Sequence, residues 1–297
     1  TGDAPAASAA GAGSGAGDGE ELPKATMRRA RDAQHHEDRQ YHGFFAEYYD
    51  VLHGTYDADI PFYLDLARKH GGPILELGSG SGRLLVPLAE AGHEVTGLDA
   101  SEDMLKRCAN RLLTQPQWVR DRVRLEHGDM LAFSLPRRFS LVLAACNTIL
   151  HCVSTDQLLA LFERARAHMA PDGLFVVDFN IPNVKKMLES DGVEEVFRVT
   201  HPEAGTELVC TYRAEYDFIR QLETIYMHLQ EFDRDRLLRA ATNTTQRAFY
   251  FPREVALALR SSGFRTVRTW TGYRHGRLVE STRDIVYICQ RSDEPRS

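Results

Sequence analysis

Short apolar runs alternate with helical patterns through the middle of the chain. The runs are bounded by glycine, proline or polar residues and span residues 73–77, 95–98, 123–125, 139–145 and 174–177. Near-continuous apolar runs are typical of strands buried on both faces of a sheet. The segments between them repeat apolar residues at helical spacing, as in Leu84, Leu85, Leu88 and Ala89. Strands separated by helices predict an α/β, doubly wound fold with a parallel sheet.

Local signals place several ends of these elements. Ser101, followed by two acidic residues, predicts a helix start, because a serine side chain accepts from the first free N–H groups. The tripeptide Pro171-Asp172-Gly173 predicts a turn before the fifth strand. Pro87 lies inside a helical pattern and predicts a kink or an early turn.

The last third of the chain has a different pattern. Stretches rich in β-branched and aromatic residues follow one another at residues 193–199, 207–218, 223–232 and 242–250, which predicts an antiparallel meander. A helix then begins at Pro252 and ends near Gly263, and two final strands follow at residues 264–270 and 284–289.

The N-terminal region divides into a tail and a helical part. Residues 1–20 are almost wholly Gly, Ala, Ser and Asp, and the charged stretch that follows carries His35 and His36 without ligand-like spacing. Helical spacing of aromatic residues begins at Tyr41, and a second helix over residues 60–69 ends at two glycines. We therefore divide the chain into a disordered tail and charged lead-in, lid helices with the core, a substrate-capping insertion, and a segment completing the core sheet, at residues 1–40, 41–180, 181–250 and 251–291.

Composition narrows the class of protein. The 297 residues include 42 acidic and 36 basic ones, a net charge of -6, and 43% are hydrophobic. This excludes disorder throughout and gives no general attraction to nucleic acid or to anionic lipid. Without an apolar run of about 18 residues or a secretory signal, we expect a soluble, cytoplasmic protein. Five scattered cysteines indicate unpaired, buried thiols, and nothing indicates a bound metal.

The strongest chemical signal is the run Glu76-Leu77-Gly78-Ser79-Gly80-Ser81-Gly82, where the first strand turns into a helix. Glycines without Cβ atoms let the backbone approach a ligand closely, and the helix N-terminus presents free N–H groups. The spacing is G-x-G-x-G with a carboxylate before it, unlike the G-x-G-x-x-G of dinucleotide sites. A pyrophosphate would be repelled by that carboxylate, whereas an amino group would be attracted.

Two further acids follow the next two strands. Asp99 comes 21 residues after Gly78 at the end of the second strand, where an acid accepts from ribose hydroxyls. Asp129 follows the third strand and suits an exocyclic adenine amine. Carboxylates at successive strand ends predict the ligand crevice of an open α/β sheet.

In this order and spacing, the three motifs resemble class I S-adenosylmethionine-dependent methyltransferases. The resemblance covers residues 41–177 and implies a Rossmann-like seven-stranded sheet with an antiparallel β insertion after strand five. It implies that S-adenosyl-L-methionine is the cofactor, with S-adenosyl-L-homocysteine as product. The cofactor-binding residues that it implies are Glu76, Gly78, Ser79, Gly80, Gly82, Asp99, Ala100, Met104, Asp129, Met130 and Asn147.

Within this class the chain is similar to the N,N-dimethyltransferases of macrolide deoxyaminosugar biosynthesis. Tyr49-Asp50 matches a Tyr-Asp that these enzymes carry near the sulfonium, and His151 matches a histidine proposed as a base. Asp178-Phe179-Asn180 departs from their aromatic-rich pattern after strand five. The catalytic residues implied are therefore His151, as a base for the nucleophile, and Tyr49.

The leading prediction is methyl transfer to an N or O of a small metabolite, such as an amino sugar or another natural-product intermediate. An NAD-dependent oxidoreductase shares the glycine turn and Asp99 but does not explain Glu76 or Asp129. A nucleic-acid or protein methyltransferase is disfavoured, since Asn147 is followed by Thr148 rather than by the Pro-Pro-aromatic sequence of base-amine enzymes. A cofactor-binding partner subunit without activity stays open, as does a homodimer, and we expect neither a nucleic-acid nor a membrane partner.

Overall fold

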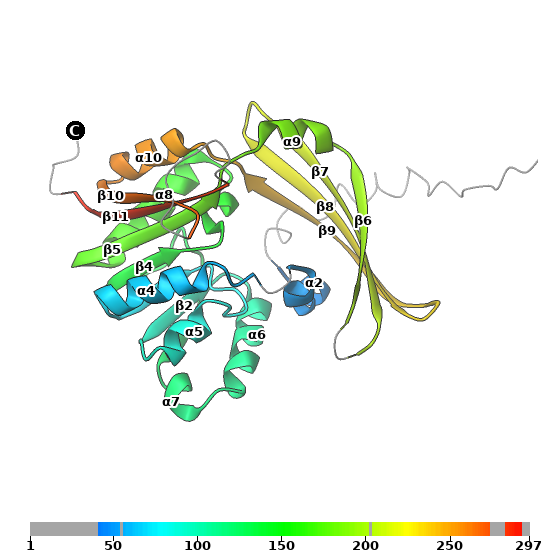
Figure 1. Cartoon of the computed structure of the whole chain (residues 1–297), viewed down its shortest axis with the longest axis horizontal. Helices are drawn as coiled ribbons and strands as arrows, with labels where there is room; N and C mark the ends of the chain where they lie inside the picture. The colour runs from blue at the N-terminus through cyan, green and yellow to red at the C-terminus, as the bar shows by residue number, and fades with distance from the viewer. Residues whose placement is uncertain (1–40, 54–55, 202–203, 274–282, 293–297) are drawn as a thin grey trace, which may run out of the picture. The chain divides into compact units, whose positions relative to one another are not determined.

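The computed structural model describes residues 41–53, 56–201, 204–273 and 283–292, and the expected tail over residues 1–40 lies outside them. The elements of the core run in chain order (Figure 1): α2 (Gly43–Glu47), α3 (Tyr49–His53), α4 (Ile60–His70), β1 (Ile74–Leu77), α5 (Leu85–Glu90), β2 (Val95–Asp99), α6 (Glu102–Leu113), α7 (Gln117–Arg120), β3 (Val123–His127), β4 (Phe139–Ala144), the 3-10 helix η2 (Thr148–His151), α8 (Thr155–His168) and β5 (Met169–Asn180). The elements after β5 are α9 (Val184–Ser190), β6 (Glu194–Thr200), β7 (Glu207–Asp217), β8 (Leu222–Asp233), β9 (Arg236–Ala248), α10 (Pro252–Ser261), β10 (Phe264–Thr271) and β11 (Asp284–Arg291).

The predicted fold class is confirmed. A seven-stranded sheet has the order β10-β11-β5-β4-β1-β2-β3, with β1 to β5 parallel and β11 antiparallel to both neighbours. Alternate residues of β1 enter different cores: Leu75 and Leu77 pack with α8 and α10, whereas Ile74 packs with α4 and α5. The two pairs of helices lie on opposite faces of the sheet in Figure 1. Burial on both faces explains why the central strands have near-continuous apolar sequences.

Strands β6, β7, β8 and β9 form a second, four-stranded antiparallel sheet, which with α9 we call the insertion. The predicted meander is confirmed, although β9 begins at Arg236, well before the predicted start at residue 242. The first residues of β9 are exposed and include two leucines between arginines, so their sequence lacks clear alternation. They join the sheet because β8 offers an unpaired edge in register with them.

Two local predictions are corrected. Residues 170–173 belong to β5 rather than to a separate turn, because β5 bulges there: Phe139 pairs with Met169, and Leu141 pairs with Leu174. The predicted turn chemistry is thus absorbed within a strand. The aromatic helix after Tyr41 is split into α2 and α3 at Tyr48, a buried residue that forms the C-cap of α2.

Other predictions agree closely with the structure. The hydroxyl of Ser101 accepts from Met104 N at 3.2 Å and caps α6, as predicted. Pro87 lies in the first turn of α5, where its missing N–H leaves no helical bond unmade. Across the part of the chain that the structure describes, no helix is both long enough and apolar enough to cross a membrane.

Candidate active site

The glycine run leaves β1 and enters α5 as a tight turn. Gly78, Gly80 and Gly82 have φ values of 66, 55 and 80°, in the left-handed region that other residues rarely adopt. A Cβ on Gly78 would lie 3.0 Å from two side-chain atoms of Thr148, and one on Gly82 would lie 2.5 Å from the sulfur of Cys108. The turn therefore needs glycine both for its backbone conformation and for space.

Glu76 lies beneath this turn with a carboxyl group that is buried and incompletely paired. Only 5% of the residue is exposed, and its Oε2 has no hydrogen-bond partner; the buried hydroxyl of Ser79 also lacks one. Burial raises the pKa of Glu76 to about 8, although the nearby Arg83 opposes that shift. A buried acid of this kind is suited to a cationic ligand group, which would restore its charge and supply the missing partner.

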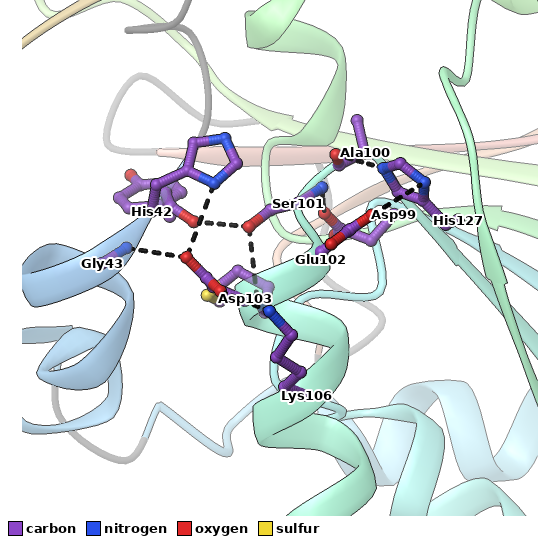
Figure 2. A network of polar contacts seen from close by, with 11 residues as sticks. His42, Gly43, Asp99, Ala100, Ser101, Glu102, Asp103, Lys106 and His127 are labelled. Carbon is purple, nitrogen blue, oxygen red and sulfur yellow. Dashed lines mark hydrogen bonds and ion pairs between the residues drawn. The ribbon is translucent and has the colours of Figure 1, made fainter.

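Asp99 ends β2 and holds the turn in place. Its Oδ2 accepts from Gly80 N at 2.7 Å, and its Oδ1 accepts from Ser101 N at 2.8 Å. Burial raises the pKa of Asp99 even though these backbone donors lower it. A carboxylate has about four acceptor positions, more than these backbone donors fill, so ribose hydroxyls can use what remains. Figure 2 shows Asp99 beside Ala100, whose carbonyl lies 3.0 Å from Nε2 of His127.

The remaining predicted cofactor residues lie along the same edge of the sheet. Met104 is buried in α6 and approaches the position of a Gly80 Cβ to within 3.4 Å, while Met130 is half-buried against the core. Asp129 follows β3, is exposed, and accepts from Leu131 N at 2.8 Å. Since β1, β2 and β3 are neighbours, their parallel ends bring the three acids Glu76, Asp99 and Asp129 to one edge, as predicted.

Asn147 has a structural task in addition to its predicted cofactor role. It adopts a left-handed conformation with φ 66°, and its side-chain oxygen accepts from Asn180 N at 2.7 Å. Its own N–H and that of Cys146 donate to the buried carboxylate of Asp178 at 2.9 and 3.0 Å. Tyr63 also donates to Asp178, so this aspartate, to which the sequence assigned no role, fixes the turn after β4.

The helices α2 and α3 are tied to the cofactor edge by polar contacts. Gly43 N donates to Asp103 Oδ2 at 2.9 Å, at the start of α6 (Figure 2). Asp50 accepts from Ser81 Oγ at 2.7 Å and from Arg107 at 2.8 Å. Burial opposes ionisation of Asp50, but these donors prevail and lower its pKa. Asp50 therefore links α3 to the glycine turn and to α6.

Tyr49 and His151 lie in the same aromatic cluster. The ring of Tyr41 packs edge-on against Tyr49 at 4.9 Å and against His151 at 6.5 Å between centroids. Burial raises the pKa of Tyr49, so its hydroxyl stays protonated. Burial, assisted by the charge of Arg247, lowers the pKa of His151 to about 4. At neutral pH His151 is an uncharged hydrogen-bonding group and a weak proton acceptor.

The insertion presents a polar cluster toward this region. Glu223 accepts from Arg247 at 2.7 Å and from the hydroxyls of Tyr212 and Tyr216 at 3.4 and 3.2 Å. Arg247 also acts electrostatically on Tyr41 and His151, which come from other parts of the chain. The sequence gives no signal for this cluster around Glu223, because its partners are set by strand register.

Arg83, Asp59 and Cys146 form a group that sequence reasoning missed. Both terminal nitrogens of the Arg83 guanidinium donate to the fully buried carboxylate of Asp59, at 2.6 and 2.7 Å. Cys146 is exposed, contrary to the expected burial, while the other four cysteines are buried. Although the residue is exposed, neighbouring atoms partly desolvate its thiol and raise the thiol pKa to about 11; the thiol interacts with Arg83 and with the nearby Tyr41 and Tyr49. In the described ranges no three His, Cys, Asp or Glu residues gather as metal ligands.

Comparison with known families identifies the central part of the chain. Residues 74–173 match the family model described as a methyltransferase domain and include the glycine turn and the ends of β2 and β4. This confirms the resemblance to methyltransferases and gives no support to the oxidoreductase alternative.

A curated relative narrows the resemblance. The dTDP-3-amino-3,6-dideoxy-alpha-D-glucopyranose N,N-dimethyltransferase of Streptomyces fradiae is 37% identical over 145 residues, which cover 46% of this chain and 54% of that protein. The chain thus spans about half the length of this relative.

Solved structures extend the likeness to the insertion. The CcbJ methyltransferase of Streptomyces caelestis has a TM-score of 0.71 at 23% identity and covers 86% of this chain and 100% of its own. SAM-bound CalS10, an amino pentose methyltransferase of Micromonospora echinaspora, has a TM-score of 0.63 at 20% identity, with 86% and 100% covered. At this identity the likeness establishes a shared fold, that of S-adenosylmethionine-dependent methyltransferases.

Proposed function

We propose that the protein transfers a methyl group from S-adenosylmethionine to a nitrogen of a small metabolite, an amino sugar or a related natural-product intermediate. The observation that carries the proposal is the buried Glu76 carboxyl, whose Oε2 has no hydrogen-bond partner, beneath a turn that needs glycine. The matching methyltransferase domain supports the cofactor, and the relative from Streptomyces fradiae supports an amino group on a sugar as the acceptor.

The chain's residues fit the parts of this cofactor. Glu76 would face the ammonium of the methionine part, and the glycine turn would leave room for its backbone. Asp99 would accept from the ribose hydroxyls, and Met104, Asp129 and Met130 would flank the adenine. The cofactor supplies an electrophilic methyl group on a sulfonium, which leaves as a neutral thioether.

Positioning of the nucleophile carries most of the remaining chemistry. Aligning two bound reactants can lower a barrier by about 7 to 11 kcal/mol. Tyr49 and His151 lie next to Tyr41, between the cofactor edge and the polar cluster of the insertion. With a pKa of about 4, His151 accepts a hydrogen bond from the substrate N–H and orients its lone pair. The proton lost from the nitrogen would then leave to solvent, since His151 is too weak a base to retain it.

Equilibrium binding provides the first test. Calorimetry with S-adenosylhomocysteine and with NADH should give micromolar binding of the former and none of the latter, and the opposite result would refute the proposal. Modification of Cys146 by a thiol reagent gives a second readout, because it is the exposed cysteine of the five. Bound S-adenosylhomocysteine should slow that reaction.

The class of substrate can be tested only by measuring turnover. A panel of nucleotide-linked amino sugars, matched hydroxy sugars and free amines, assayed by release of S-adenosylhomocysteine, should give product only with the amines. Turnover of a hydroxy sugar at the rate of its amino counterpart would replace N-methylation by O-methylation. Tight cofactor binding without turnover of any member would favour a non-catalytic subunit.

A further inference from the structure

The insertion carries two matched arginine–glutamate pairs on one face. Glu223 is the register partner of Arg247, and Glu231 is the register partner of Arg239. Each member of one pair lies eight residues from its counterpart on the same strand, so all four side chains point to the same side of the sheet. At about 3.3 Å per residue, the pairs are about 26 Å apart. The pair containing Arg247 faces His151, and the other lies at the far end of the same face.

The distant pair is extended by contacts to α2. Arg239 donates from Nε to Glu231 at 2.6 Å, and its two terminal nitrogens donate to the two carboxylate oxygens of Glu47 at 2.8 and 2.7 Å. The hydroxyl of Tyr48 accepts from the same guanidinium at 2.8 Å, and the ring of Phe44 lies 4.4 Å from it. One side chain of the insertion thus uses a two-pronged carboxylate contact, a hydroxyl and an aromatic face of one short helix.

An apolar contact accompanies the polar one. Phe45 of α2 and Tyr48, its C-cap, pack with Leu208, Cys210 and Leu229 of the insertion, all buried. Leu208 is the register partner of Glu231, so the apolar cluster adjoins Arg239. Glu231 is itself buried and is also held by Thr206 at 2.8 Å. The arginine is therefore anchored in the insertion before it reaches α2.

The helix α2, which Arg239 contacts, is also linked to the cofactor edge by hydrogen bonds. The segment that contains α2 and α3 contacts α6 through Gly43 and Asp50, and it contacts the glycine turn through Asp50. Tyr41 precedes α2 in this segment, and Tyr49 is the first residue of α3. Any movement of α2 away from the insertion would displace the tyrosines that lie beside Cys146 and His151.

We propose that Arg239 is a positioning residue that clamps the α2–α3 segment to the insertion and so couples closure over the cofactor to placement of the substrate-facing cluster. The proposal rests on the proposed function for the identity of the cofactor, but the clamp itself does not depend on it. The surface pair of Arg198 and Glu207 does not connect the insertion to α2, because both residues lie on neighbouring strands of one sheet.

The double variant Glu47→Ala/Tyr48→Phe tests the clamp. It removes the polar contacts of Arg239 to α2 but leaves its bond to Glu231 and the aromatic ring at position 48. In the full chain without cofactor, Cys146 should react with a thiol reagent about fivefold faster than in the wild type. S-adenosylhomocysteine should bind about fivefold more weakly, with a coupling of the size usual between linked sites.

Hydrogen exchange followed by mass spectrometry reads the coupling directly. In the wild type, S-adenosylhomocysteine should slow exchange in the first residues of β9, which contain Arg239, and this protection should be lost in the double variant. Glu207→Ala is the matched control, because it breaks a carboxylate–arginine contact inside the insertion and should change none of the three readouts. Arg239→Lys keeps the charge but not the two-pronged contact. Its Cys146 labelling rate and its affinity for S-adenosylhomocysteine should lie between those of the wild type and the double variant.

Wild-type labelling and affinity in Glu47→Ala/Tyr48→Phe would overturn the proposal. So would equal labelling of the buried Cys152 and Cys289, since general unfolding rather than lid release would then explain the result. Failure of the wild type to bind S-adenosylhomocysteine would refute the proposed function instead, and the cofactor-free labelling of Cys146 would still decide whether the clamp exists.

Discussion

The seven-stranded sheet and the insertion build their parts of the site in different ways. All four residues of β1 are buried, whereas six of the seven residues of β6 are exposed and one is half-buried. In the parallel sheet, the ligand-facing residues are positioned by backbone turns and strand ends, where little space is left for an added side-chain atom. The insertion positions its polar groups through side-chain pairs across strands. We therefore expect substitutions at the cofactor edge to be severe and those in the insertion to be graded.

The largest contrast should come from equivalent glycine substitutions in the two regions. Gly78 and Gly192 both have positive φ values, 66 and 69°, but a Cβ would meet Thr148 at 3.0 Å in the first case and nothing within 4 Å in the second. Both alanine variants should lose about 1 to 2 kcal/mol of stability from the backbone conformation. Gly78→Ala should also lower kcat/KM about 100-fold, because the glycine turn shifts.

Thermal unfolding and steady-state kinetics compare the two variants. Gly192→Ala should keep wild-type kcat/KM at a temperature where both are folded. Equal kinetic losses would show that backbone strain alone, and not the space beside Thr148, explains the result.

The next effect concerns Glu76 and has opposite signs for stability and for binding. Its pKa of about 8 in the cofactor-free protein exceeds the ordinary 4.5, so the folded state retains a proton that the unfolded chain has released. Its contribution to stability is greatest below about pH 4.5 and declines as the pH rises through about 8. Glu76→Gln should therefore raise the melting temperature of the cofactor-free protein near pH 8.

Cofactor binding should show the reverse sign. A ligand ammonium favours the ionised carboxyl, so binding releases a proton, and affinity for S-adenosylhomocysteine should fall up to tenfold per unit as the pH drops below about 8. Calorimetry in two buffers of different ionisation enthalpy would detect the proton. Glu76→Gln should bind about tenfold more weakly at pH 8 and show a flatter profile. A wild-type affinity independent of pH would argue against this role.

A smaller effect is expected at His151. The alanine variant should lower kcat by about fivefold at saturating substrate, through lost orientation of the nucleophile. The acidic limb of the wild-type kcat/KM profile should not arise from His151 above about pH 5, because its pKa is about 4. Full turnover of His151→Ala from about pH 6 to about pH 9 would remove the orienting role.

The smallest effect separates the two faces of the insertion. Arg247 faces His151 and lowers its pKa, whereas Arg213 stacks 4.3 Å over the ring of Tyr226, its register partner, on the opposite face. Removing the positive charge in Arg247→Met should raise the pKa of His151, measured by proton resonance titration of the imidazole. Arg213→Met is the matched control and should leave that titration unchanged. A shift of equal size in both variants would mean that the charge acts through the whole sheet.

Much of the fold could be predicted because its signals are local. The glycine turn, the cap at Ser101 and the acid at the end of β2 depend on backbone conformation and strand ends, and each is written within a few residues. The misplaced turn at residues 170–173 shows the limit of such signals, since the pairing with β4 converts turn chemistry into a bulge. The start of β9 was predicted too far along the chain for the same reason. Its first residues have a weak pattern of their own and form a strand because they pair with the edge of β8.

The sequence by itself determined the α/β order, the position of the cofactor turn and the acids that line the ligand edge. Only the tertiary structure decided that Asp178 holds the turn at Asn147, that Arg247 lies near His151, and that Arg239 contacts Glu47, 192 residues away. The physical reason is that periodicity and turn chemistry act over a few residues, where the backbone alone sets the geometry. The identity of a charged residue does not indicate its partner, because the partner is set by strand register and helix packing in the folded chain.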